Sequence, residues 1–171
     1  GHADVLQLDD LLDAAAAGAA VPAWVATELE FGIADALNND GSYDYQGNAN
    51  AASPNSPGPA KGGIGLQGLF LIGELAGARV DAVTAYVDSW WDDSGIGVNS
   101  WGCGGWVNKG CAYSMYNNFK GLKLHGIQTL PSVTRPAGPG PIPAGDWHED
   151  YKDWLLANQV APTTTGGGSW S

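Results

Sequence analysis

Apolar residues recur at helical spacing in the stretch CAYSMYNNFKGLKLHGI, residues 111–127. Side chains three and four positions apart lie on one side of a helix, so this spacing predicts a helix with a single buried face. The apolar positions that form this face are Ala112, Met115, Tyr116, Phe119, Leu122 and Ile127. The following residues, 131–145, are rich in Pro and Gly. They cannot continue the helix, because proline lacks the amide donor and clashes with the preceding turn.

A second helix is predicted over DWHEDYKDWLLANQ, residues 146–159. Asp146 and Glu149 have the spacing of a capping box, in which side chains satisfy unpaired backbone amides at the start of a helix. The apolar stripe of this helix consists of Trp147, Tyr151, Trp154 and Leu155. Together the two helices form a predicted αα-hairpin.

The same plan occurs twice earlier in the chain. Residues 62–77 are crowded with glycine and predict a buried helix that allows close helix contact, and residues 80–93 predict its amphipathic partner. Residues 6–20 and 21–40 predict the first pair, with Pro22 near a helix start, where its missing amide is harmless.

The chain is therefore predicted to be one all-α domain of about six helices in three hairpins. The approximate repeats cover residues 4–45, 60–102 and 111–170, and the predicted loops are residues 46–63, 92–110 and 131–145.

Each predicted hairpin ends in a tail that combines glycine with an aromatic residue. The tails are Asp40, Gly41 and Tyr43 within NNDGSY, residues 94–102, and the segment from Gln159 to Trp170. A lone hairpin cannot cover its apolar faces, so stacked repeats must be joined, and we expect Trp170 to be buried against a neighbouring helix. The alternative for the last tail is a disordered exit that carries a stray tryptophan. NNDGSYD also has the oxygen-rich composition of part of a calcium loop, but it lacks the EF-hand spacing and glutamate, so a turn is preferred.

These tails resemble a known family. The Gln159-to-Trp170 segment is similar to a stretched QW motif, Gln-x-x-x-Gly-x-Trp, of the terpenoid cyclase and protein prenyltransferase superfamily, and NNDGSY resembles its DGSW variant. The helix pair of residues 111–127 and 146–159 resembles the inner and outer helices of these squalene-cyclase-type repeats. The resemblance implies an α/α toroid, in which the Gln and Trp join the outer helix of one repeat to its neighbour. Three hairpins would then make half a ring, a smaller variant, or a part of a longer protein.

Composition limits the possible partners. The chain has 171 residues, 44% of them hydrophobic and eight of them Trp, which suffices for a real core. A formal net charge of -11 repels phosphate backbones and anionic membrane surfaces, so nucleic acid is not expected as a partner. No apolar run approaches the roughly 18 to 20 residues that span a bilayer, so membrane insertion is not expected. Gly1 and His2 look like the remnant of a purification tag, and other domains of a longer native protein are possible partners.

Cys103 and Cys111 lie in WGCGGWVNKGC and are the two cysteines of the chain. An even count and a short loop favour a disulfide, and with it a secreted or cell-surface protein. Two buried thiols in a cytosolic protein are the alternative. The pair lacks C-x-x-C spacing and no second Cys/His pair follows, so neither zinc nor a cofactor is expected.

No complete catalytic motif of the resembled family is present. DDLLD, residues 9–13, has the form of the D-D-x-x-D motif of class I terpene synthases. That activity belongs to a different fold and needs a second metal motif, so an acidic helix turn stabilised by the helix dipole is preferred. Asp92 and Asp93 lack the preceding aspartate of the class II motif, and the prenyltransferase zinc set is also missing.

The candidate ligand-binding residues lie on the predicted helix at 111–127. Tyr113, Asn117 and Lys120 share one side of it, beside Tyr116 and His125. On an inner helix this side would line a concave pocket, where aromatic rings, amides and hydroxyls suit carbohydrate or another neutral polar ligand. Polar contacts between neighbouring helices are the alternative.

The expected function is a repeat-built module of a secreted or cell-surface protein that binds or scaffolds without catalysis. The alternatives are an extracellular polysaccharide lyase or glycosidase, or a fragment of a terpene-cyclase-like enzyme. A lyase or glycosidase predicts His125 or His148, a tyrosine and a carboxylate around one pocket. His148 stands beside Glu149 and Asp150, but adjacent residues fan out around a helix, so a surface helix start explains this cluster better.

Overall fold

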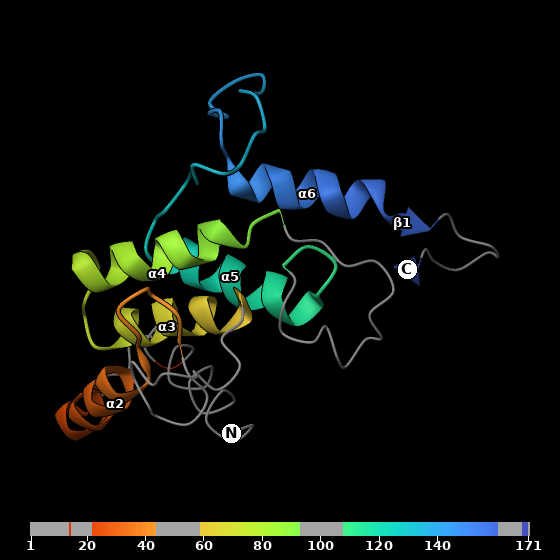
Figure 1. Cartoon of the computed structure of the whole chain (residues 1–171). Coiled ribbons are helices and arrows are strands. Elements are labelled where there is room, and N and C mark those ends of the chain that lie inside the picture. The colour runs from red at the N-terminus through yellow and green to blue at the C-terminus, as the bar shows by residue number, and fades with distance from the viewer. Residues whose placement is uncertain (1–13, 15–21, 44–58, 93–107, 161–168, 171) are drawn as a thin grey trace.

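The computed structural model describes residue 14 and residues 22–43, 59–92, 108–160 and 169–170. In this part of the chain five helices are present, and the predicted all-α class is confirmed (Figure 1). The helices are α2 (Ala23–Ala36), α3 (Pro59–Leu71), α4 (Ala78–Ser89), α5 (Ala112–Leu124) and α6 (Trp147–Ala157). Two short strands, β1 (Gln159–Val160) and β2 (Ser169–Trp170), pair antiparallel.

The start and end of α3 differ from the prediction. The helix begins at Pro59, so the predicted loop over residues 46–63 is wrong at its end, because proline fits the first helical turn without loss of a hydrogen bond. It ends at Leu71 rather than near residue 77, because Gly73 adopts a left-handed conformation with φ 83 that closes the helix. The predicted loop over residues 131–145 is confirmed as non-helical.

Other predicted segments are only partly covered. Residue 14 is helical, whereas the rest of the predicted helix at 6–20 and residues 93–107 lie outside the described residues.

α3 lies at the centre of the described helices and contacts α2, α4 and α5 (Figure 1). Most of its length is buried between these neighbours. Its glycines have no side chain, so the neighbouring helices can approach its backbone closely. The core side chains come from every helix and from the loop before α6. Among the fully buried ones are Ile33, Leu66, Leu69, Val83, Val87, Leu122 and Trp147.

Two glycines bring α3 and α5 together. A Cβ on Gly121 would lie 2.6 Å from the Gly63 carbonyl oxygen, and a Cβ on Gly63 would lie 2.3 Å from the Asn117 carbonyl carbon. This close approach decides which side of α5 faces inward. Met115 and Leu122 of the predicted apolar face are buried, and Ile127 packs partly buried against the core. The prediction is wrong for Ala112, Tyr116 and Phe119, which are exposed, whereas Asn117 and Asn118 are buried.

The first predicted tail, NNDGSY after α2, is a turn that packs against α3 and α4. Asp40 Oδ1 accepts hydrogen bonds from the Ser42 amide at 2.9 Å and the Ser42 hydroxyl at 2.7 Å. Gly41, with φ 85, packs so tightly that a Cβ would lie 2.0 Å from the Ala82 carbonyl oxygen of α4. The Tyr43 ring covers Gly65 of α3.

The last predicted tail, after α6, has a related backbone pattern. Gln159 pairs with Trp170 in the β1–β2 ladder, much as Leu37 pairs with Tyr43 beyond α2. In both places a helix ends and a residue one or two positions later forms a β-type pair with the aromatic residue of the tail. The Trp170 side chain lies outside the described residues, so its burial stays a prediction.

Candidate functional site

One side of α5 carries exposed aromatic rings and two lysines. Tyr113 is 48% exposed, Tyr116 51% and Phe119 38%. Lys120 is half-buried and Lys123 is exposed. Three- and four-residue steps place all five on one side of the helix, away from Gly121 and α3. We call these five residues the outward face of α5.

Contacts within this face hold some of its side chains in place. The Lys120 ammonium donates to the Tyr116 hydroxyl at 3.4 Å and lies 5.6 Å from the centre of the Tyr116 ring. Phe119 packs edge-on against Trp147 and lies 5.8 Å from the His148 ring. His148 of α6 therefore borders the outward face of α5 at Phe119.

Two of the predicted ligand residues lie elsewhere. Asn117 points into the α3–α5 interface, where its side-chain oxygen accepts from the Gln67 amide at 3.2 Å. His125 lies at the end of α5, with Nε2 2.7 Å from the Leu66 carbonyl oxygen and Nδ1 3.1 Å from that of Leu75. Both ring nitrogens thus lie beside backbone carbonyl oxygens, and the nitrogen that carries the proton donates to one of them. The structure brings together Tyr113, Tyr116, Lys120 and, at the edge, His148.

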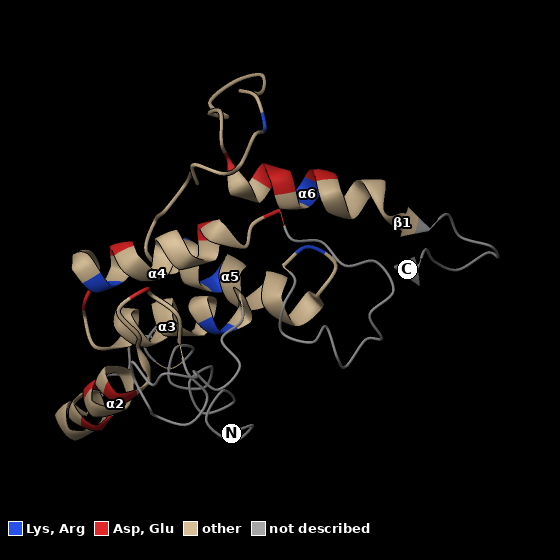
Figure 2. Ribbon diagram, in the orientation of Figure 1, with Lys and Arg blue, Asp and Glu red and all other residues tan. Residues whose placement is uncertain are grey.

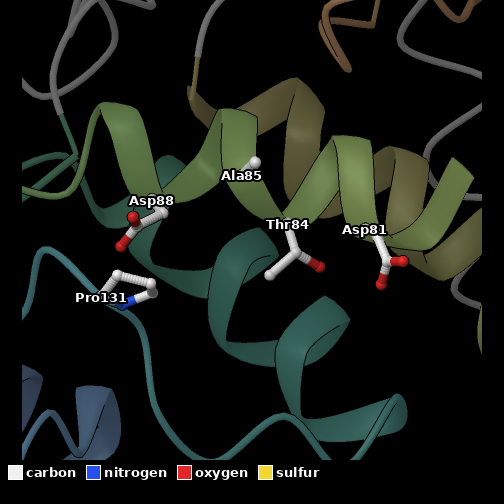
Figure 3. A pocket seen from close by; sticks show the side chains of 5 residues that line it. All are labelled: Asp81, Thr84, Ala85, Asp88 and Pro131. Carbon is white, nitrogen blue, oxygen red and sulfur yellow. The ribbon is translucent and has the colours of Figure 1, made fainter. Parts of the chain in front are cut away.

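A shallow hollow of about 230 Å³ lies beside α4 (Figure 3). Its lining residues are Asp81, Thr84, Ala85, Asp88 and Pro131, and none of them was singled out from the sequence. Asp81 and Asp88 stand on either side of Thr84 (Figure 3). Seven residues of helix separate their backbones by about 10 Å along the axis. Carboxylates that cleave a glycosidic bond together lie about 5 to 9.5 Å apart. Asp88 also accepts a hydrogen bond from the Ser132 amide at 2.9 Å, so this carboxylate ties the loop at Ser132 to α4.

A buried polar cluster joins the end of α4 to α6. The Trp91 indole, fully buried, donates to Asp150 Oδ2 at 2.7 Å and stacks on Tyr151 with ring centres 4.4 Å apart. Lys109 forms an ion pair with Asp150 at 2.6 Å. This cluster fixes α6, and thereby His148, relative to α4.

Asn108 is the hub of this cluster. Its amide nitrogen donates to the Trp91 carbonyl oxygen at 3.2 Å, and its amide oxygen accepts from Asn118 and from the Tyr151 hydroxyl. Burial raises the pKa of Tyr151, so this hydroxyl stays a donor. The sequence offered no signal for the cluster, because Asp150 looked like one more acid of an exposed helix start and its partners come from distant segments.

Cys111 begins α5. Its sulfur accepts a hydrogen bond from the Ser114 amide at 3.4 Å, and the residue is buried. Cys103 lies outside the described residues, so the Cys103–Cys111 disulfide stays a prediction.

An alignment of α5 with α3 could have revealed the outward face of α5 from the sequence. Both helices have 13 residues, and GLFL at the end of α3 corresponds to GLKL at the end of α5. In this alignment four buried positions of α3 become the exposed or half-buried positions of α5. Ala60, Gly63, Leu66 and Gln67 correspond to Tyr113, Tyr116, Phe119 and Lys120.

Comparisons with protein-family models, curated proteins and solved structures gave no match to this chain. Within the described residues no helix has the length and apolar character needed to cross a membrane. The same residues contain no group of three or more His, Cys, Asp or Glu side chains placed to hold a metal ion.

Proposed function

We propose that this chain is a repeat-built module of the α/α-toroid type that acts by binding rather than catalysis, and that the outward face of α5 is its binding surface. The observation that carries this proposal is that four buried positions of α3, two of them occupied by the small residues Ala60 and Gly63, correspond to larger, exposed or half-buried residues of α5. Gly63 is covered by α5, whereas Tyr116 at the corresponding position is 51% exposed. Exposed aromatic clusters are typical of binding surfaces.

The contacts of the first tail support the repeat organisation. Gly41 and Tyr43 lie against α4 and α3, so the end of one hairpin is fixed to both helices of the next. This is the joining role that the resemblance to terpenoid cyclase and prenyltransferase repeats implies for such tails. A partial toroid is therefore part of the proposal. The secreted or cell-surface location, which the two cysteines favour, is part of it as well.

Binding is preferred over catalysis because of where the histidines lie. A lyase or glycosidase needs a histidine, a tyrosine and a carboxylate around one pocket. His125 is engaged by two backbone carbonyls, and His148 is 55% exposed at its side chain with Glu149 as its nearest acid, 3.7 Å away. Neither lines the hollow beside α4.

The residue types on the outward face of α5 suit carbohydrate or another neutral polar ligand. Tyrosine rings stack on the apolar face of a sugar while their hydroxyls exchange hydrogen bonds with it. Tyr113 and Tyr116 are one helical turn apart, about 4.5 Å along the axis, so both rings can contact one extended ligand.

The experiment is affinity electrophoresis of the full chain through gels that contain neutral polysaccharides. We expect retardation of the wild type and its loss in the Tyr113→Ala/Tyr116→Ala double variant, because both stacking platforms are removed. The matched control is Leu75→Ala/Leu156→Ala, which removes two exposed apolar side chains outside α2 and α5, 57% and 61% exposed, and should leave sugar binding unchanged. Retardation that survives in the α5 variant, or turnover of the polysaccharide, would contradict the proposed role of this face.

A further inference from the structure

A second exposed aromatic surface lies on α2. Trp24 is 69% exposed and Phe31 68%, and Glu28 and Asp35 are exposed as well. Steps of three and four residues put these four side chains on one side of α2. Ile33, on the opposite side, is fully buried against Gly68 of α3. We call Trp24, Glu28, Phe31 and Asp35 the outward face of α2.

The two outward faces lie at opposite ends of a row of helices. α3 meets α2 at Gly68 and α5 at Gly63, and these positions are about 140° apart around the α3 axis. α2 and α5 therefore pack on nearly opposite sides of α3. Each turns its buried side toward α3 and its aromatic side away from it.

The faces carry opposite charges (Figure 2). α2 contains Glu28, Glu30 and Asp35 and no Lys or Arg, whereas α5 contains Lys120 and Lys123 and no Asp or Glu. Ion pairs within the described part of the chain engage Glu30 with Arg79, but they do not engage Glu28 or Asp35. In a chain of net charge -11, a helix that carries two lysines and no acid differs in charge from most of the chain.

We propose that the outward face of α2 in one copy of this chain docks on the outward face of α5 in a second copy. This inference rests on the proposed binding role of the α5 face and names its partner. Trp24 and Phe31 would pack on Tyr113 and Tyr116, with acids and lysines at the rim. Aromatic rings dominate the binding energy of protein interfaces, and rim charges set orientation and association rate.

Such a contact joins two unlike surfaces. A docked pair keeps one unused face of each kind, one on either copy, so the association is head to tail and either closes into a ring or extends as a filament. For a module of three hairpins, head-to-tail docking continues the row of helices from one copy into the next.

The experiment is sedimentation velocity of the full chain over a concentration series at low and high salt. We expect reversible association at low salt that weakens as salt rises, because screening reduces the rim attraction. Reversing the charge of either face alone, in Glu28→Lys/Asp35→Lys or in Lys120→Glu/Lys123→Glu, should weaken association at least about tenfold. All four residues lie at the surface, and circular dichroism verifies that each variant is folded.

The decisive measurement is sedimentation of a mixture of the two charge-reversed variants. The basic α2 face of the first then meets the acidic α5 face of the second, and the original faces remain complementary in the other direction, so association should return. A wild type that stays monomeric, or association that ignores both variants, overturns the docking of copies. If polysaccharide binding is then still lost in Tyr113→Ala/Tyr116→Ala, the binding role of α5 stands and only its partner changes. If neither self-association nor polysaccharide binding depends on α5, both proposals fall.

Discussion

Gly121 of α5 lies directly against the backbone of Gly63 in α3. A Cβ on Gly121 would come within 2.6 Å of the Gly63 carbonyl oxygen and 2.9 Å of the Leu66 Cβ, distances that packed side chains do not reach. Backbone atoms cannot give way as a flexible side chain can. The backbones of the two helices therefore touch at these glycines. This contact sets which side of α5 faces outward.

Gly121→Ala should lower the free energy of unfolding by about 1 to 3 kcal/mol, because the added methyl forces α3 and α5 apart. Gly32→Ala is the matched control. Gly32 also lies in a helix, but a Cβ there meets nothing within 4 Å, so alanine should raise stability by up to about 1 kcal/mol through its better helix propensity. Urea unfolding of the two variants measures the difference, and equal effects would contradict the close contact.

Gly41→Ala should destabilise the chain more than Gly73→Ala. Both glycines have positive φ, 85 and 83, so alanine at either position costs about 1 to 2 kcal/mol in backbone strain. Only at Gly41 would the new Cβ also collide with a backbone oxygen, that of Ala82, whereas Gly73 has open space around it. Thermal unfolding of the two variants separates the backbone strain from the steric collision with Ala82. A Gly41 variant no less stable than the Gly73 variant would mean that the first tail does not fix itself to α4.

Asp150→Ala should be destabilising, by about 1 to 3 kcal/mol, because it leaves the buried Trp91 indole without its acceptor and removes one of the two acids that pair with Lys109. The control is Asp153→Ala, also on α6. Asp153 pairs with Arg135 at the surface and is 54% exposed at its side chain, so its loss should change stability by about 1 kcal/mol or less. Chemical unfolding followed by tryptophan fluorescence measures both. Similar losses in the two variants would show that the polar cluster does not hold α6.

Stability should fall in strongly alkaline solution, in part through Tyr43. Burial raises the pKa of Tyr43 from 10.0 to about 12, so the unfolded chain loses this proton at lower pH than the folded chain. The contribution of Tyr43 is therefore fully present below pH 10.0 and is lost as the pH rises toward about 12.

Tyr43→Phe should make that decline shallower, as measured by urea unfolding at several pH values across this window. Burial also raises the pKa of Tyr86 to about 12, so part of the decline should persist in the variant. The control, Tyr113→Phe on the exposed side of α5, should keep the wild-type slope. An unchanged slope in Tyr43→Phe would mean that its ring is not buried on Gly65.

Local chemistry made several elements predictable from the sequence. Asp146 caps α6 through its side chain, which accepts from the Glu149 amide at 3.0 Å, as the capping-box spacing indicates. The turn at NNDGSY and the non-helical course of residues 131–145 follow from Asp, Gly and Pro in the same way. Each of these features depends on residues a few positions apart, so one stretch of sequence contains the whole physical cause.

The arrangement of the candidate site was not predictable in this way. Periodicity indicated that α5 has one apolar side, but it assigned Tyr116 and Phe119 to the core and left Asn117 on a pocket wall. The contact between Gly63 and Gly121 rotates Asn117 and Asn118 inward instead and leaves the rings outside. Asn117 accepts a hydrogen bond there from the Gln67 amide, and the Asn118 amide nitrogen donates one to Asn108.

The sequence by itself therefore determined the all-α class, the cap of α6 and the turn of the first tail, because short-range sterics and hydrogen bonding decide them. Only the tertiary structure decided which side of α5 is outward and that Trp91, Asn108 and Asp150 share one cluster. Those outcomes depend on how closely two backbones can approach and on partners up to 59 positions apart in the chain, which no local pattern encodes.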